Sequence, residues 1–164
     1  MLKEDITQIR KDRHKKTQED FTPPEVLEVM FDGIDESLYT NFKKTFCDPC
    51  IGTGNIYLWV LEKRLENCKN ANDVYKAIST MYGTELMSDN VRECKQNILM
   101  TLLRFSANND WDLKDKKIVN IIDKNIVCTD TFKWDYENWK PMYEQKQLSL
   151  FEERLRRDNE NKNI

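Results

Sequence analysis

The sequence predicts an α/β protein in which the strands of a parallel sheet alternate with helices. Three short segments with strand character each end in an acidic residue, and the longest stretch between them repeats its apolar residues at helical spacing. Because parallel strands present their carboxyl ends at one edge, where ligands bind, the three acids are expected to lie on that edge. The strand segments are 44–47, with Asp48 at its carboxyl end; 81–86, with Glu85 near its end; and 125–130, ending in Asp130.

Capping residues and apolar spacing predict the helices. Thr22 is expected to be an N-cap, with Pro23 in the first helical position and the helix ending near Gly33. Residues 118–124 fit more than one state. The other helices are expected over 55–67, over 73–79 and from Ser88 onward, where Val91, Cys94, Ile98 and Leu102 recur at helical spacing.

Composition limits the classes of function. The chain has 164 residues, enough for one domain with a real core, and a net charge of -3, so any contact with DNA has to be local. No apolar run approaches the roughly 20 residues of a membrane span, and the first residues lack a signal-peptide core. We therefore expect a cytoplasmic protein with no membrane partner. An odd count of five cysteines and a single histidine favour reduced thiols over a metal site at Cys47-x-x-Cys50.

Three regions are predicted along the chain. Residues 1–20 form a charged arm or helix, which is either solvated or in contact with phosphates. Residues 21–143 form a cofactor-binding domain, and residues 144–164 form a tail.

The most informative segment is Asp48-Pro49-Cys50-Ile51-Gly52-Thr53-Gly54-Asn55. It predicts a strand end, a tight glycine turn and a helix start, an arrangement that cradles a nucleotide-like cofactor. NAD fits poorly, because the third glycine of its fingerprint is absent and Asp48 places a negative charge where a pyrophosphate would lie. S-adenosylmethionine, whose amino-acid end is cationic, fits better.

Four segments in register resemble the adenine-N6 DNA methyltransferases of restriction-modification systems. Phe21-Thr22-Pro23-Pro24-Glu25-Val26 resembles the N-terminal F-T-P-P-x-V segment of that family, and the glycine turn resembles its D-P-A-C-G-x-G-x-F motif. Residues 82–86 and 125–132 resemble its G-x-E and N-I-x-x-x-D-x-L strands. The resemblance covers residues 17 to about 135 and implies a Rossmann-like methyltransferase fold with a truncated parallel sheet and flanking helices.

The resemblance also implies a role for each matching residue with S-adenosylmethionine as cofactor. Thr22 and Pro23 would line the methionine end, and Asp48 with the backbone of Gly52 and Gly54 would hold the amino-acid and ribose portion. Further along the chain, the implied contacts are Glu85 to the ribose hydroxyls, Leu86 and Met87 to the adenine ring, Asp130 to the adenine amino group, and Phe132 packed nearby. Taken singly, Leu86, Met87 and Phe132 are equally well explained as core residues.

The catalytic loop of the family is not found. In these enzymes a fourth strand leads to an N-P-P-Y or D-P-P-Y loop that binds the target amino group and stacks on a flipped base. The nearest approach is Asn138-Trp139-Lys140-Pro141-Met142-Tyr143, in which the spacing is wrong. Residues 134–139 are acidic and aromatic, unlike a buried parallel strand. No catalytic residue is therefore assigned.

The tail carries a separate signal. Gln147-Leu148-Ser149-Leu150-Phe151 resembles the pentapeptide by which bacterial proteins dock on the DNA polymerase sliding clamp (its β subunit), where a glutamine amide binds at the rim and two apolar side chains fill a pocket. The alternative is a helix over 144–157 that buries Leu148, Phe151 and Leu155.

Two functions from different classes remain open. The first is a methyltransferase that is recruited to replicating DNA by the clamp and depends on an atypical loop or a second methyltransferase subunit. The second is an inactive binding protein of the same fold that occupies the clamp pocket and interferes with replication or redirects it. A viral origin is compatible with both.

Overall fold

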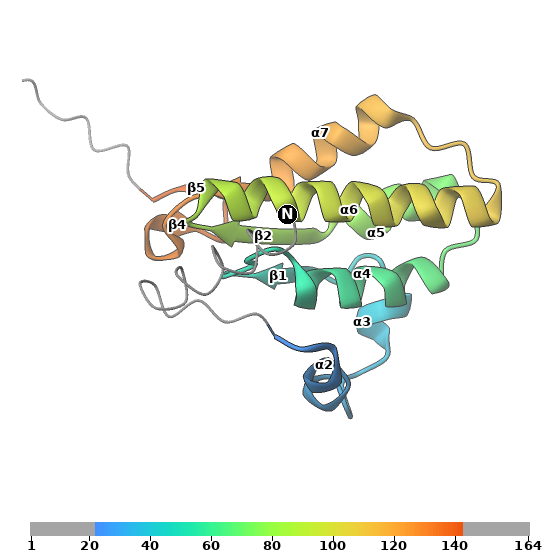
Figure 1. The fold of residues 1–164 in the computed structure, drawn as a ribbon, viewed down its shortest axis with the longest axis horizontal. Helices are drawn as coiled ribbons and strands as arrows, with labels where there is room; N and C mark the ends of the chain where they lie inside the picture. The colour runs from blue at the N-terminus through green and yellow to red at the C-terminus, as the bar shows by residue number, and fades with distance from the viewer. Residues whose placement is uncertain (1–21, 143–164) are drawn as a thin grey trace, which may run out of the picture. The chain divides into compact units, whose positions relative to one another are not determined.

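The computed structural model describes residues 22–142. The chain divides into two compact units, Met1–Thr131 and Phe132–Ile164, and each is described by itself. The predicted α/β class is confirmed in the first unit, where strands and helices alternate around one parallel sheet (Figure 1).

The sheet of the first unit has three parallel strands in the order β1-β2-β3. The strands are β1 (Phe46–Asp48), β2 (Met81–Glu85) and β3 (Ile126–Cys128). In register, Asp48 lies beside Gly83, Gly83 lies beside Ile126, and Glu85 lies beside Cys128. The central strand β2 therefore extends its acid two residues beyond the level of Asp48.

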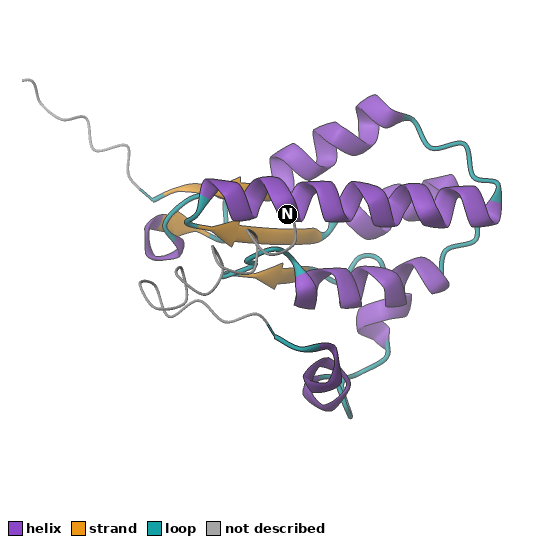
Figure 2. Ribbon diagram, viewed as in Figure 1, coloured by secondary structure: helices purple, strands orange, loops and turns teal. Residues whose placement is uncertain are grey.

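Helices pack on the sheet and on one another. The long helix α6 lies beside α4 and also contacts α7, as Figures 1 and 2 show. The side chains of Met81 and Ile126, which register places on the same face of the sheet, are fully buried, whereas Cys47 on the opposite face is exposed. The helices are α2 (Pro24–Met30), α3 (Ser37–Thr40), α4 (Asn55–Glu66), α5 (Ala71–Ser79), α6 (Ser88–Asn109) and α7 (Asp115–Asn125).

Arg64 is fully buried within this fold. Its Nε donates to the carbonyl of Leu38 at 3.0 Å, its Nη2 to Lys44 at 2.7 Å, and its Nη1 to Ala77 at 3.1 Å and to the Thr80 hydroxyl at 2.8 Å. One guanidinium thus joins α4 to α3, to the chain that enters β1 and to the end of α5. Burial lowers the pKa of Arg64, and these four acceptors satisfy its charged form.

The structure corrects two local expectations and resolves one ambiguity. Pro23 is the N-cap of α2 and makes no side-chain cap hydrogen bond, so the helix begins one residue later than predicted. The ambiguous residues 118–124 are helical and belong to α7. Asn125 ends that helix instead of starting a strand, because its buried amide donates to the carbonyls of Ile78 and Ser79 at the end of α5 and of Met81 at the start of β2.

The second unit contains a short antiparallel hairpin, β4 (Trp134–Asp135) paired with β5 (Lys140–Pro141), after the 3-10 helix η1 (Thr131–Lys133). The Trp139 ring packs edge-on against Trp134, with ring centroids 5.4 Å apart, and Trp139 has a positive φ of 51°. The expectation that residues 134–139 do not form a buried parallel strand is confirmed.

Candidate functional site

The glycine turn connects β1 to α4 as the sequence predicts. Gly52 and Gly54 both have positive φ, 55° and 98°, and Gly54 is the N-cap of α4. A Cβ on Gly54 would lie 2.9 Å from the Cys94 Sγ on α6, so both backbone conformation and space require glycine there. The turn is fixed further by the amide of Ile51, which donates to the Thr84 carbonyl at 3.0 Å.

Asp48 is a buried carboxylate with an unused oxygen. Its side chain is 8% exposed; Oδ1 accepts from the Cys50 amide at 3.2 Å, and Oδ2 has no hydrogen-bond partner among the described residues. Burial raises the pKa of Asp48, and the nearby charge of Glu85 raises it further. A cation delivered by a ligand would relieve both effects.

Glu85 closes the other side of the turn. Its Oε2 accepts from the Gly52 amide at 3.0 Å and its Oε1 accepts from the Met87 amide at 2.8 Å. Each carboxylate oxygen has a second lone pair, so Glu85 can still accept hydrogen bonds from two hydroxyls of a ligand. The Gly52 and Met87 amides hold the carboxylate in position to accept these hydrogen bonds.

The segment before α2 is attached to the same turn. The Asn55 side-chain Nδ2 donates to the Thr22 carbonyl at 3.1 Å, across 33 residues of sequence. Thr22 is half-buried and Pro23 is exposed. The structure therefore brings Thr22 to the start of α4, next to the glycine turn, and Asn55 is a positioning residue that the sequence did not reveal.

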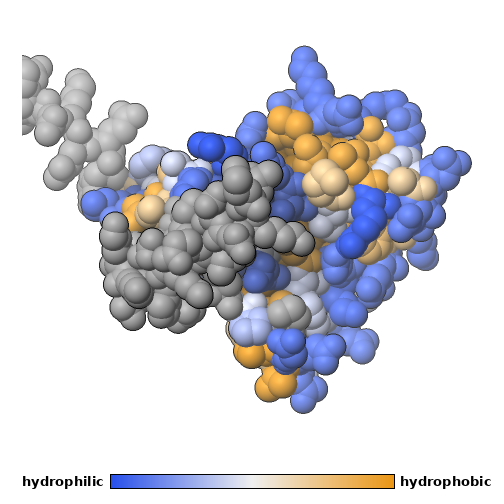
Figure 3. Space-filling view, in the orientation of Figure 1, coloured by the Kyte–Doolittle hydropathy of each residue, from blue (hydrophilic) through white to orange (hydrophobic). Residues whose placement is uncertain are grey.

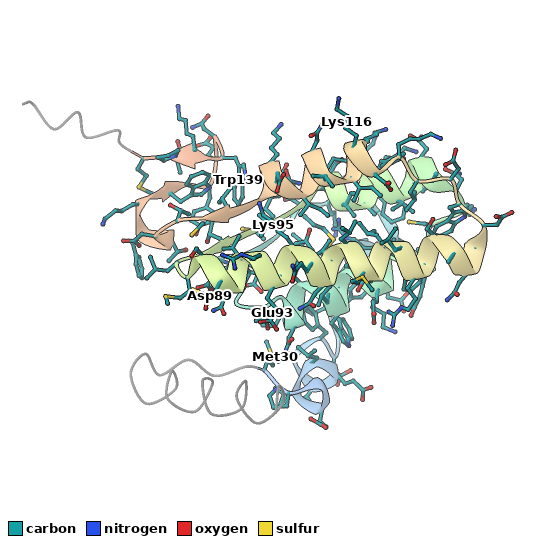
Figure 4. The ribbon with its side chains drawn as sticks, turned by 45° about the horizontal axis from the view of Figure 1, so that its top comes forward. Met30, Asp89, Glu93, Lys95, Lys116 and Trp139 are labelled. Carbon is teal, nitrogen blue, oxygen red and sulfur yellow. The ribbon has the colours of Figure 1, made fainter. Side chains whose placement is uncertain are left out.

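The first turns of α6 complete the described surroundings. Asn97 donates its Nδ2 to the Thr53 carbonyl at 3.1 Å, so α6 also holds the glycine turn. Asp89 and Glu93 lie on one side of this helix and Lys95 lies on the other (Figure 4). Lys95 pairs with Asp123 of α7 at 2.8 Å.

The remaining predicted residues lie as follows. Leu86, directly after β2, is 67% exposed and Met87 is half-buried, so neither is the core residue of the alternative interpretation. Asp130 follows β3 by two residues, and the amide of the intervening Thr129 donates to the Glu85 carbonyl at 2.8 Å, so the third acid shares the edge with the other two. Phe132 belongs to the second unit and is 88% exposed, so it is not core either.

The charge of the site suits a cation. Neither Asp48 nor Glu85 forms an ion pair with a lysine or arginine within residues 22–142. Burial and the same two acids raise the pKa of Cys94 to about 12, which keeps that thiol neutral under the turn. An ammonium or sulfonium group would meet one unused buried oxygen and two uncompensated carboxylates, whereas a phosphate would be repelled.

The described part of the chain offers neither a metal-binding cluster nor a membrane-spanning helix. It contains no group of three or more His, Cys, Asp or Glu side chains that could hold a metal ion. In the same residues, no helix is long and apolar enough to cross a membrane.

Comparison with known protein families decides the family. The sequence profile of the family described as N-6 DNA Methylase matches residues 6–155, which is most of the chain. The chain belongs to the N-6 DNA methylase family. No curated protein and no solved structure matches it.

The nearest approach to the target loop of an N-6 DNA methylase is held in the hairpin of the second unit. The Asn138 amide Nδ2 donates to Asp135 Oδ2 at 2.8 Å, and the backbone amides of Glu137 and Asn138 donate to Asp135 Oδ1. These bonds lower the pKa of Asp135 and close a turn. Asn138 is thus engaged in local structure, and Tyr143 lies outside the described residues.

Proposed function

We propose that this N-6 DNA methylase chain binds S-adenosylmethionine at the carboxyl edge of its sheet. The observation that carries the proposal is the unused buried Oδ2 of Asp48, which lies near the charge of Glu85 and next to a turn in which Gly52 and Gly54 both have positive φ. The cofactor supplies a methyl group activated by a sulfonium centre. This chain supplies two carboxylates, Asp48 and Glu85, that favour the positively charged end of that molecule.

The assignments divide the cofactor among the residues around the turn. Asp48 binds the ammonium group, and Glu85 accepts hydrogen bonds from the ribose hydroxyls. Thr22 and Pro23 line the methionine end, a role supported by the hydrogen bond that attaches Thr22 to Asn55. Leu86 and Met87 contact the adenine ring, for which the high exposure of Leu86 leaves room. Asp130 is proposed for the adenine amino group.

Calorimetric titration of the full chain with S-adenosylmethionine tests this proposal. Saturable binding that is lost in Glu85→Ala and retained in Glu66→Gln, a carboxylate at the far end of α4, is expected. An affinity unchanged by Glu85→Ala would refute the ribose assignment.

A further polypeptide segment is proposed to complete the sheet for methyl transfer to the adenine N6 of DNA. Within residues 22–142, β1 pairs only with β2. The Phe46 amide donates to Thr80 at the start of β2, and alternate residues of a strand direct their backbone groups to the same side, so Cys47 directs its own away from β2. Sheets of this class place the ligand where the strand order reverses, between the first strand and a neighbour on this outer side.

Methyl transfer from radiolabelled S-adenosylmethionine to unmodified DNA tests the enzyme. Incorporation is expected when the chain is mixed with the carboxyl-terminal part of an intact N-6 DNA methylase, beginning at its fourth strand. Cys47→Pro should abolish this gain, because proline blocks the outer edge without removing a bond to β2. No incorporation in any mixture, with or without the sliding clamp, would leave the inactive binding protein as the function.

Docking on the bacterial sliding clamp is proposed from the tail alone. Residues Gln147, Leu148, Ser149, Leu150 and Phe151 lie outside the described residues, so the support is the match of five consecutive residues. An active enzyme would be brought to replicating DNA in this way, and an inactive one would block the clamp pocket. Binding of the purified chain to the purified clamp, measured by calorimetry, tests the docking directly.

A further inference from the structure

A cavity lies along α4, lined by Trp59 and Lys63 of that helix. It has a volume of about 590 Å³ and is bounded by the end of α2, by the segment from residue 31 to residue 36, by α3 and by one side of α4. Trp59, Lys63 and Asn67 line it at intervals of four residues, which places them on one face of α4. None of the residues assigned to the cofactor lines this cavity.

Three aromatic side chains form its wall, and we refer to this cavity as the aromatic pocket. Phe31 stacks on Trp59 with ring centroids 4.5 Å apart and 18° between the ring planes, and Tyr39 meets Trp59 edge-on at 5.8 Å. The Tyr39 hydroxyl is buried without a hydrogen-bond partner among the described residues, and burial raises the pKa of Tyr39. The wall is therefore rigid and apolar, with a polar atom that the fold leaves unsatisfied.

Carboxylates surround this wall. Glu28, Asp32 and Glu36 all line the pocket, and none of them forms an ion pair or a side-chain hydrogen bond with another described residue. Among the described residues of the lining, Lys63 is the one cationic side chain. The pocket therefore carries an excess of negative charge beside an electron-rich aromatic surface.

The ammonium group of Lys63 lies near the aromatic face of Trp59. Its Nζ lies 5.7 Å from the centroid of the Trp59 ring and 3.5 Å from Glu66 Oε2, with 43% of its side chain exposed. An exposed ammonium that can turn toward Glu66 or solvent is a weak competitor for the aromatic face. A ligand cation can replace it there while Lys63 keeps its partner on α4.

We propose that the aromatic pocket binds an alkylammonium group. Aromatic faces and unpaired carboxylates both favour an organic cation, and the same carboxylates exclude anions such as phosphate. A metal ion is disfavoured because the described residues contain no group of three or more His, Cys, Asp or Glu side chains placed to hold one. The surface beside the pocket is apolar as well, since Val29 and Met30 of α2 are 76% and 48% exposed (Figure 3).

The test titrates the full chain with choline chloride while the indole N–H signals are followed by NMR. The chain has four tryptophans, and Trp59→Phe assigns the relevant signal. A saturable shift of the Trp59 signal is expected with choline but not with 3,3-dimethyl-1-butanol, its uncharged isostere, or with sodium chloride at equal ionic strength. Putrescine in a parallel titration distinguishes primary from quaternary ammonium groups, and binding of either supports the proposal.

Variants of the charged residues that line the pocket should change its affinity for choline in opposite directions. Asp32→Asn and Glu36→Gln should each weaken binding by about threefold, as expected for exposed charges. Lys63→Met should strengthen it, because the competing ammonium is removed. Glu62→Gln is the matched control, since that acid is on α4 but pairs with Arg104 of α6.

Two outcomes of the titration would overturn the proposal: an equal response to choline and its isostere, or no saturable shift with either cation. Glu85→Ala changes the cofactor site but no residue that lines the aromatic pocket, so it should leave the Trp59 response to choline intact. Loss of the response in that variant would show that choline had bound in the cofactor site, and would overturn the proposal in the same way, so failure of this site and failure of the cofactor site can be told apart.

Discussion

The Glu85 carboxylate and the Gly52 amide, 33 residues apart in sequence, are joined by a hydrogen bond of 3.0 Å across the end of the sheet. This bond connects the acid of the central strand to the turn after the first strand. The carboxylate is thereby fixed before any ligand arrives, which reduces the entropy lost when a ligand binds.

The first prediction concerns Glu85→Gln. Glutamine keeps the shape of the side chain but replaces one acceptor oxygen with a donor, which faces either the Gly52 amide or the Met87 amide and can no longer accept from a ribose hydroxyl. The affinity for S-adenosylmethionine should fall by about 10- to 100-fold, the range expected when a hydrogen bond to a charged group is lost. Calorimetry measures this, with Glu66→Gln as the control of equal charge change. Equal affinities in the two variants would contradict the assignment.

The second prediction concerns Asp48→Asn and pH. The folded-state pKa of Asp48 is raised above its ordinary value of 3.8 by burial and by Glu85. Stability linked to this group is therefore fully present below pH 3.8 and is lost as the pH rises through the raised pKa. Asp48→Asn should raise the thermal midpoint of the ligand-free chain at pH 7, and the gain should disappear near pH 3.8.

The same variant should have the opposite effect on ligand binding. Asparagine can still accept from the Cys50 amide but offers no charge to a cation. Calorimetry at pH 7 should show weaker binding of S-adenosylmethionine by the more stable protein. A variant that is both less stable and equally able to bind would contradict the role given to Asp48.

The third prediction separates two reasons for glycine at position 54. Gly54→Ala places a methyl group 2.9 Å from the Cys94 Sγ in a backbone with φ of 98°. Gly33→Ala is the control, because φ there is 73° but no atom lies within 4 Å of the added group. Urea unfolding should show a cost of about 1–2 kcal/mol for Gly33→Ala, from left-handed strain alone, and a larger cost for Gly54→Ala. Equal costs would mean that the contact with Cys94 is relieved without penalty.

The fourth prediction concerns Arg64→Met. Methionine fills much of the same space but leaves the carbonyls of Leu38, Lys44 and Ala77 without their donor in a buried region. The free energy of unfolding should fall by about 3 kcal/mol or more, since each buried acceptor left unpaired costs about 1–3 kcal/mol. Urea denaturation measures it. Lys63→Met, which also replaces a cation with methionine but at a half-exposed position one residue earlier, should cost far less.

The strands and their acids were predictable because each is a local signal. An apolar run that ends in an acid places Glu85 at a strand end whatever else the fold does, and positive φ at Gly52 and Gly54 follows from the turn that their spacing requires. The shared edge of the three acids then follows from parallel topology alone. Local patterns of this kind also predicted a helix over 55–67, and α4 ends only one residue earlier, at Glu66.

Contacts between distant segments were not predictable from these patterns. A buried Arg64 has the same sequence signature as a solvated one, and nothing near Asn125 indicates that its amide will bind the start of β2. The attachment of Thr22 to Asn55 is hidden for the same reason. Apart from the Thr80 hydroxyl that Arg64 also contacts, the partners are backbone carbonyls, which every residue carries, so the sequence does not indicate which residue will be the partner.

The fifth prediction concerns the tail. Leu150→Ala combined with Phe151→Ala should abolish binding to the sliding clamp in calorimetry, because the two apolar anchors carry most of the energy of such a peptide. The thermal midpoint should hardly change, since an extended docking segment contributes nothing to the core. Leu155→Ala is the matched control: it should leave both clamp binding and the midpoint unchanged. If residues 144–157 instead form a helix that buries Leu148, Phe151 and Leu155, both the double variant and Leu155→Ala will lower the midpoint, because each leaves a cavity in the core.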